Sequence, residues 1–374
     1  MKIRAAVLRD SRKKHPFSET MPLQIEDVDL DPPGPDEVLM EIKAVGLCHS
    51  DLVAINGERG KPMPMVIGHE AAGIIVGLGS NVVDIDIGDH VVPSYVASCG
   101  RCDMCREGRP ALCIPAFKSN AAGTMLDGTT RLHQGGNRIF HHSGIAAFAE
   151  YAVISINAIV KIDKELPFEQ AALFGCGVCT GVGAVVNTAK IRPGQTAAIV
   201  GLGGVGLSAM LAAIASGADR VIAVDVNEDK LKLALELGAY KAFNARDADC
   251  VEKILQATGG GVHIAVETAG APQALETAYK ITARGGTTVA AGMPGPDATI
   301  TLSHLSLSGE ERTLKGSYMG SCVPSRDIPR FIGLFQNGKL PIDKLTSHQI
   351  KFEELNEAFD RMVEGSALRQ VMVL

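Results

Sequence analysis

The 374-residue sequence contains no tryptophan, and only 4% of its residues are aromatic. It has no uninterrupted apolar run of the roughly 18 residues that a membrane span needs, which argues against a membrane protein. Positive charge is not in excess either, because the formal net charge is −6, and this argues against binding to a nucleic-acid backbone through a basic face. The apolar run near Met1 is too short for a signal peptide. We therefore expect a soluble, cytoplasmic protein without a nucleic-acid or membrane partner.

Hydrophobic residues make up 46% of the chain and glycines number 41, a composition typical of a globular protein with many tight turns. The length favours two domains over one core. The chain has nine cysteines, and four of them lie between Cys99 and Cys113. In a reducing cytosol such a group favours metal binding over disulfides.

The first third of the chain indicates short strands, separated by glycine, proline and aspartate turn residues. We predict strands over 38–45, 72–76 and 90–92. The stretch 114–145 has little periodicity and is expected to be a long functional or interfacial loop.

Near residue 178 strands begin to alternate with helices, which predicts a parallel, doubly wound sheet. Strands are expected over 196–200 and 220–224, at a segment ending at Ala242, and over 262–266. Helices are expected up to about Ser216, over about 228–237 and from about Asp249. The pattern weakens after 320, where a helix over about 352–362 and a final strand over 370–374 are predicted.

A G-x-G-x-x-G motif follows the first of these strands and opens a helix. Its residues are Gly201, Leu202, Gly203, Gly204, Val205 and Gly206. The first glycine permits the tight turn, the second lets the backbone approach a pyrophosphate, and the third lets helix and strand pack closely. Asp225 ends the next strand, where its carboxylate can accept both adenosine-ribose hydroxyls and repel a 2′-phosphate. The alternative for Asp225 is a solvated strand end; the motif favours an NAD site.

Four cysteines stand in a C-x2-C-x2-C-x7-C pattern, namely Cys99, Cys102, Cys105 and Cys113. A loop that doubles back can present all four thiolates to one tetrahedral Zn²⁺. An iron–sulfur site shares the spacing of the first three, but typically continues C-x3-C-P, whereas Cys113 follows after seven residues and precedes Ile114. Because a four-cysteine site has no open position, we assign it a structural zinc.

Three further segments place soft ligands beside turns: Gly46-Leu-Cys48-His49-Ser50-Asp51, Gly68-His69-Glu70 and Gly175-Cys176-Gly177. Each signal is weak alone, since a single cysteine or histidine is more often a packed core residue. In this order and at these separations, the three segments, the four-cysteine loop and the glycine motif are together typical of one protein family. Over essentially its full length the chain resembles the zinc-containing medium-chain alcohol dehydrogenases.

The resemblance implies a mixed α/β fold, with a GroES-like β-rich catalytic domain over 1–177 and 321–374 and a Rossmann NAD-binding domain over 178–320. It implies a catalytic zinc held by Cys48, His69 and Cys176, with the fourth position open to substrate. Glu70 would lie behind this metal, and Asp51 would orient His69 through its second N–H.

The resemblance also assigns groups to the cofactor and the proton. Ser50 resembles the family's relay hydroxyl, but Val53 stands where relatives with a full relay carry histidine, so we predict a weaker or shifted pH dependence of hydride transfer. His49 and Arg369 match positions that contact the pyrophosphate. Thr180 matches a threonine beside the nicotinamide, and Lys230 a lysine near the adenosine ribose.

Substrate and assembly are less closely defined. Tyr95, His142 and Met293 match positions that line the family's substrate pocket, with ordinary packing as the alternative. The stretch 114–145 resembles the loop of the dimeric branch, so a homodimer is expected. The glutathione-dependent branch has an arginine where this chain has Phe117 beside Lys118, which disfavours that activity.

The function expected is reversible hydride transfer from a primary or secondary alcohol to NAD⁺, with two zinc ions per chain. An S-(hydroxymethyl)glutathione or polyol dehydrogenase on the same scaffold is the alternative. A non-enzymatic zinc-stabilised NAD sensor and a zinc-free quinone reductase are both disfavoured by the joint presence of Cys48, His69 and Cys176.

Overall fold

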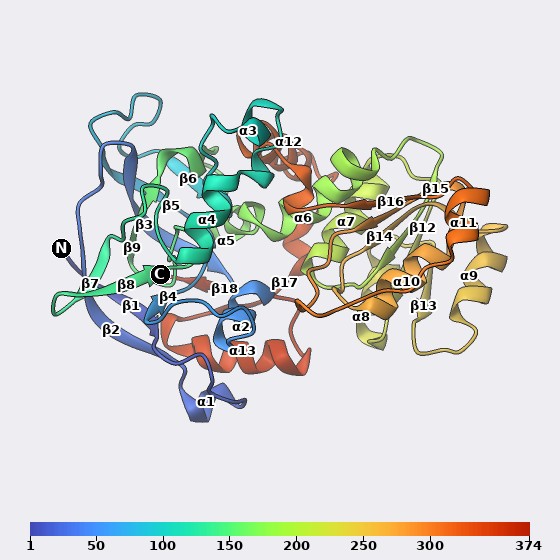
Figure 1. Ribbon diagram of the computed structural model, residues 1–374, viewed down its shortest axis with the longest axis horizontal. Coiled ribbons are helices and arrows are strands. Elements are labelled where there is room, and N and C mark those ends of the chain that lie inside the picture. The colour runs from blue at the N-terminus through green and yellow to red at the C-terminus, as the bar shows by residue number, and fades with distance from the viewer. The chain divides into compact units, whose positions relative to one another are not determined.

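The computed structural model describes residues 1–374, which form two compact units (Figure 1). The β-rich unit comprises Met1–Cys176, Val323–Ile332 and Asp343–Leu374, and the α/β unit comprises Gly177–Cys322 and Gly333–Ile342. The sequence had assigned all of 321–374 to the β-rich domain, and this differs from the observed division. The segment Gly333–Ile342 groups with the α/β unit, and its Leu340 and Ile342 are fully buried.

The first sheet of the β-rich unit closes into a barrel in the order β1-β2-β7-β8-β4. Its strands are β1 Lys2–Leu8, β2 Leu23–Leu30, β7 Leu132–Gln134, β8 Asn137–His141 and β4 Met65–Val66. Ala5, Val7 and Leu30 belong to one cluster of buried apolar residues, and closure of the barrel leaves no free strand edge.

The second sheet has seven strands in the order β10-β6-β5-β3-β18-β17, with β9 also paired to β3. Its strands are β3 Glu37–Gly46, β5 Glu70–Leu78, β6 His90–Pro93, β9 Tyr151–Ser155, β10 Ile159–Lys161, β17 Thr346–Ile350 and β18 Arg369–Val373. The end of β3 determines the site, because Gly46 pairs with Glu70 of β5 on one side and with Val371 of β18 on the other. A side chain at position 46 would collide with Glu70 and Arg369, so glycine lets these strand ends approach.

Short helices surround these sheets, namely α1 Phe17–Thr20, α2 His49–Ile55, α3 Asp103–Arg106, α4 Ile114–Ala122, α5 Phe168–Ala171 and α13 Leu355–Glu364. The helix α12 Pro324–Gln336, which the weakening pattern did not predict, contributes residues to both units.

The stretch 114–145 is not the unstructured loop that the sequence suggested. It contains α4 and the barrel strands β7 and β8. The helix buries only Ala116, so it lacks the repeated apolar face by which a helix is recognised in sequence, and the two strands are short.

The α/β unit contains a six-stranded parallel sheet in the order β13-β12-β11-β14-β15-β16. Its strands are β11 Thr196–Val200, β12 Arg220–Asp225, β13 Lys241–Asn244, β14 Val262–Glu267, β15 Thr282–Ala290 and β16 Thr313–Gly316. Its helices are α6 Gly177–Gly183, α7 Gly204–Ala215, α8 Glu228–Glu236, α9 Cys250–Thr258, α10 Pro272–Lys280 and α11 His304–Gly309. The alternation read from the sequence is confirmed, apart from a strand that ends at Asn244 and not at Ala242.

The buried strand β11 explains this architecture. All five of its residues are buried, as expected for a parallel strand covered on both faces. The chain leaves its carboxyl end through Gly201 and enters α7, which places the glycine motif at that edge of the sheet.

No single helix is long and apolar enough to cross a membrane. One bent pair of segments, Phe168–Gly175 with Gly177–Ala189, would be long and apolar enough together, by length and composition only.

Candidate functional site

Three segments of the β-rich unit bring Cys48, His69, Glu70 and Cys176 together. Cys48 caps the N-terminus of α2, His69 immediately precedes β5, and Cys176 follows a short 3₁₀ turn. All four are buried, and their potential ligand atoms lie within 4.8 Å of one another. Gly68 makes this possible, because its φ of +90° turns the chain and a Cβ there would lie 2.7 Å from the Phe148 amide nitrogen.

The donor set fits a zinc ion. His69 uses Nδ1 in a hydrogen bond to Asp51, while its Nε2 is buried without any partner. A buried polar atom without a partner is costly unless something else binds it. Two cysteine sulfurs and this free imidazole nitrogen are the Cys2His set that holds zinc with one open position.

Glu70 already has a cationic partner. The guanidinium of Arg369, at the start of β18, pairs with its carboxylate, and both side chains are buried. Burial lowers the pKa of Arg369 from its usual value. Arg369 was expected at a pyrophosphate; the structure places it against Glu70, and the cofactor contact stays a prediction.

Asp51 holds two histidines. Its Oδ1 accepts from Nδ1 of His69 and from Nδ1 of His142, each at 3.0 Å, and from the Gly68 backbone N–H at 3.0 Å. Its Oδ2 accepts from the Cys48 backbone N–H at 3.3 Å. Sequence reasoning expected the bond to His69 and assigned His142 to the substrate pocket. It missed the second bond, for which a separation of 91 residues leaves no local signal.

The charges within this group support one another. A hydrogen bond with Cys176 lowers the pKa of Cys48, against the effect of burial, and His69 adds to it. Burial alone would lower the pKa of His69, but the charges of Asp51 and Cys48 raise it well above its usual value. The site therefore stabilises a thiolate and a positive charge next to it, and a metal cation would take the place of that proton.

The other predicted residues of this unit lie nearby. Tyr95 is buried and meets the His69 ring edge-on, with ring centroids 4.8 Å apart. His49 and Ser50 begin α2 directly after Cys48, with His49 exposed and Ser50 half-buried. Val53 lies on the same helix. The structure thus brings the predicted ligands, Tyr95 and His142 into one neighbourhood.

The four-cysteine loop forms a second metal-ligand group. Its sulfurs lie within 4.8 Å of one another, with Cys102 and Cys105 at 3.6 Å and Cys102 and Cys113 at 4.0 Å. The backbone N–H of Cys105 lowers the pKa of Cys102 to about 6. Four converging sulfurs, with a thiolate favoured at one of them, fit a tetrahedral zinc without an open position.

The glycine motif in the α/β unit has the stereochemistry of a dinucleotide loop. Gly201 has a φ of +93°, and a Cβ on Gly206 would lie 1.8 Å from the Gly201 carbonyl oxygen. A Cβ on Gly203 would meet nothing within 4 Å, so this glycine leaves space that a ligand can occupy. Gly204 and Val205 begin α7, whose N-terminal N–H groups favour phosphate.

Asp225 ends β12 next to this loop. Its Oδ2 accepts from the Leu202 backbone N–H at 2.6 Å and its Oδ1 from the Asn227 N–H at 2.9 Å. Lys230 lies in the first turn of α8, which Asn227 caps. Thr180 lies buried in α6, whereas Met293 is 55% exposed, so the structure does not place Met293 in a buried pocket of this unit.

Comparisons with known proteins agree with this arrangement. The model of the alcohol dehydrogenase GroES-like domain matches residues 34–164, and that of the zinc-binding dehydrogenase matches 204–337. An S-(hydroxymethyl)glutathione dehydrogenase from Synechocystis sp. is 35% identical over 376 residues, covering 100% of both chains.

Two solved structures share the whole fold. An alcohol dehydrogenase zinc-binding domain protein from Burkholderia ambifaria is 36% identical with a TM-score of 0.95, and benzyl alcohol dehydrogenase from Acinetobacter calcoaceticus is 34% identical with a TM-score of 0.94. Each match covers 100% of this chain and 99% of the other. The chain belongs to the zinc-containing medium-chain alcohol dehydrogenases.

This alcohol dehydrogenase is accordingly an NAD-dependent oxidoreductase with zinc as its metal, acting on small molecules. Its fold combines a GroES-like β-rich domain with a Rossmann domain, as the sequence predicted.

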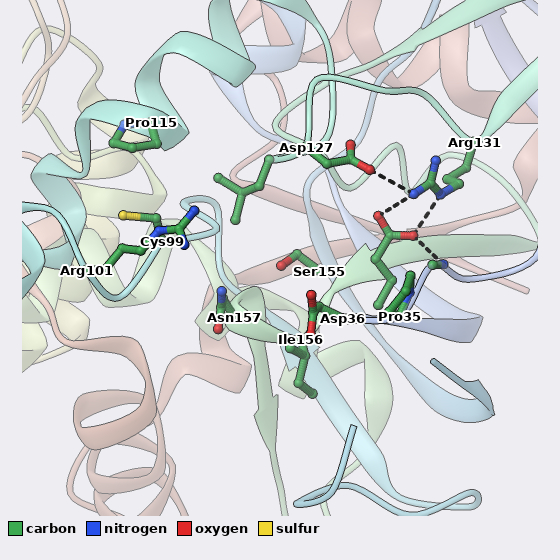
Figure 2. A pocket seen from close by; sticks show the side chains of 13 residues that line it. Pro35, Asp36, Cys99, Arg101, Pro115, Asp127, Arg131, Ser155, Ile156 and Asn157 are labelled. Carbon is green, nitrogen blue, oxygen red and sulfur yellow. Dashed lines mark hydrogen bonds and ion pairs between the residues drawn. The ribbon is translucent and has the colours of Figure 1, made fainter. Parts of the chain in front are cut away.

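A further cavity of the alcohol dehydrogenase, of about 380 Å³, lies beside the four-cysteine loop in the β-rich unit. Figure 2 shows Cys99 and Arg101 on one side of it and Asp127 directed towards Arg131 on the other. Arg131 is bound by Glu37 and Asp127, so this cation already has anionic partners. The cavity contains none of the predicted catalytic residues.

Proposed function

We propose that the enzyme catalyses the reversible transfer of hydride from a primary or secondary alcohol to NAD⁺, giving an aldehyde or ketone. The observation that carries this proposal is the group of Cys48, His69 and Cys176, with the Nε2 of His69 buried and unpartnered. A zinc ion bound there supplies a Lewis acid that lowers the pKa of a coordinated alcohol.

The surrounding residues keep these ligands in place. Asp51 accepts the Nδ1–H of His69, which leaves Nε2 as the metal-facing atom and determines the orientation of the ring. Arg369 balances the charge of Glu70, so the ligand group does not carry an unpaired carboxylate next to two cysteine sulfurs.

The alcohol proton leaves through the start of α2. We assign the Oγ of Ser50 to accept it and pass it on, with His49 next to it in the sequence. Because Val53 offers no basic nitrogen, the route ends at the ribose, another side chain or water. A pH profile of single-turnover hydride transfer is expected to lack an imidazole-like ionisation; one that persisted in a His49→Gln variant would contradict this route.

The α/β unit binds the dinucleotide. Gly203 leaves room for the pyrophosphate at the N-terminus of α7, and the Asp225 carboxylate accepts the adenosine-ribose hydroxyls. Thr180 and Lys230 are assigned to the nicotinamide and ribose sides. Cofactor kinetics test this assignment, because NADP turned over as efficiently as NAD would contradict the role of Asp225.

A second candidate is S-(hydroxymethyl)glutathione oxidation, favoured by the name of the relative that is 35% identical. Parallel assays with benzyl alcohol, S-(hydroxymethyl)glutathione and sorbitol distinguish an alcohol, glutathione-linked or polyol dehydrogenase. Absence of NADH formation with all three substrate types, in protein that contains zinc, would contradict the proposed function.

We further propose a homodimer joined at edge strands of the Rossmann sheet, which light scattering in solution tests.

A further inference from the structure

Lys61 is a half-buried ammonium group whose hydrogen bonds go only to uncharged oxygens. Its Nζ donates to the backbone oxygen of Asn120 at 2.5 Å and to the Asn120 Oδ1 at 3.0 Å, both on α4. Burial, together with the charge of Arg59, lowers the pKa of Lys61 to about 8, and no carboxylate acts in the opposite direction.

A half-buried cation without a counter-ion is destabilised, because its charge loses part of its hydration and two amide oxygens only partly replace it. Two other cations of the unit have carboxylate partners: Arg131 pairs with Glu37 and Asp127, and Arg369 pairs with Glu70. An ammonium group has three N–H bonds, and only two of them have a protein acceptor here, the two oxygens of Asn120. The remaining capacity points to an anionic ligand.

The position of Lys61 connects it to the site. Asn120 also donates from Nδ2 to the Tyr95 hydroxyl at 3.4 Å, and Tyr95 lies edge-on to His69. The charge of Lys61 also reaches His142. Lys61 is therefore separated by one side chain from Tyr95, a residue predicted to line the substrate pocket.

Two further cations belong to the segments that contain Lys61 and its partner Asn120. Arg59 precedes it by two residues, and Lys118 lies on α4 two residues before Asn120; both are exposed. The neighbouring carboxylate, Glu58, accepts from Asn56 at 3.0 Å. The charge of Arg59 thus adds to that of Lys61, and together they attract anions.

We propose that the preferred substrate is an alcohol carrying a carboxylate, and that Lys61 binds this carboxylate while the hydroxyl lies at the group of Cys48, His69 and Cys176. The proposal rests on the proposed function and names its substrate class. The carboxylate can belong to a small aromatic or aliphatic alcohol, or to the adduct of a peptide thiol such as S-(hydroxymethyl)glutathione. Both present the same group to the ammonium.

The test compares 4-(hydroxymethyl)benzoate with benzyl alcohol as the ratio of their kcat/KM values, in the zinc-loaded enzyme. Lys61→Gln is expected to lower this ratio about 10-fold or more, the effect of losing a charged hydrogen bond. Lys61→Arg keeps the charge and should retain most of the preference. Added salt should lower the ratio in the wild type and not in Lys61→Gln.

Lys13→Gln is the matched control. Lys13 is also half-buried in the same unit and donates only to backbone oxygens, those of Thr20 and Met21. Its replacement should leave the ratio unchanged. The same variants assayed with S-(hydroxymethyl)glutathione distinguish the two sources of the carboxylate: a Lys61 effect on this substrate alone assigns the site to the peptide-thiol adduct.

Equal ratios in the wild type and Lys61→Gln, with no Lys61 effect on S-(hydroxymethyl)glutathione, would overturn the inference even when benzyl alcohol is oxidised. Failure of the wild type to oxidise any alcohol would instead overturn the proposed function. Circular dichroism and thermal unfolding of each variant verify that a changed ratio does not come from misfolding.

Discussion

Replacing His142 by phenylalanine should weaken zinc binding at the catalytic site. His142 donates one of the four hydrogen bonds that hold the Asp51 carboxylate, and this carboxylate orients His69. Phenylalanine keeps an aromatic ring in the space but removes the donor.

The expected size follows from the remaining bonds. A hydrogen bond to a charged group contributes about 1.5–3 kcal/mol, and loss of a residue that supports a metal ligand typically costs 10- to 100-fold in metal affinity. Because Asp51 keeps its bonds to Gly68, His69 and Cys48, we expect the lower end, about a 10-fold loss of affinity. His142→Asn should restore most of it, since its side-chain amide offers an N–H at the position of Nδ1.

The assay is release of zinc to a chelator, followed by a metal indicator. The four-cysteine loop is an internal control, because its zinc should be released at the same rate in all variants. Cobalt substitution adds a spectroscopic measurement, since the ligand-field bands should shift in His142→Phe and return in His142→Asn. Identical release rates in the wild type and His142→Phe would refute the positioning role of His142.

Three other predictions concern different parts of the chain. Gly206→Ala should lower both the thermal stability and the affinity for NAD, because its Cβ meets the loop backbone, whereas Gly203→Ala should lower only the affinity. Calorimetry and NAD titration check this, and equal effects of the two variants would contradict the assigned roles. Cys99→Ala should lose the structural zinc and lower the Tm while the other zinc stays, and elemental analysis showing both zincs retained would contradict this. Burial raises the pKa of Asp360, but two backbone N–H groups of α1 lower it below its usual value. The carboxylate therefore stabilises the fold above about pH 4 and loses this effect as the pH falls through the lowered pKa. The stability difference between wild type and Asp360→Asn, measured by urea unfolding, should accordingly shrink in acid.

The α/β unit could be predicted closely because its signals are local. The buried strand β11, the glycines after it and Asp225 at the end of the next strand lie within one short stretch, and each is dictated by backbone geometry. The four-cysteine loop is local in the same way.

The rest depends on contacts between distant segments. The bond between His142 and Asp51 exists because the chain after β8 returns to the N-terminus of α2. No periodicity marks α4, whose face is mostly exposed, so the partner that it gives to Lys61 could not be foreseen. A single lysine outside any helix or strand has no pattern in sequence, and only its surroundings reveal a cation without a counter-ion.

The central claim is that Cys48, His69 and Cys176 hold a catalytic zinc separate from the structural one. Elemental analysis of the purified protein and of its Cys176→Ala variant tests this most directly, with circular dichroism to verify the fold. We predict two zinc ions per chain in the wild type and one in the variant, with activity lost and the fold kept. A single zinc in the wild type, or two in the variant, would contradict the account.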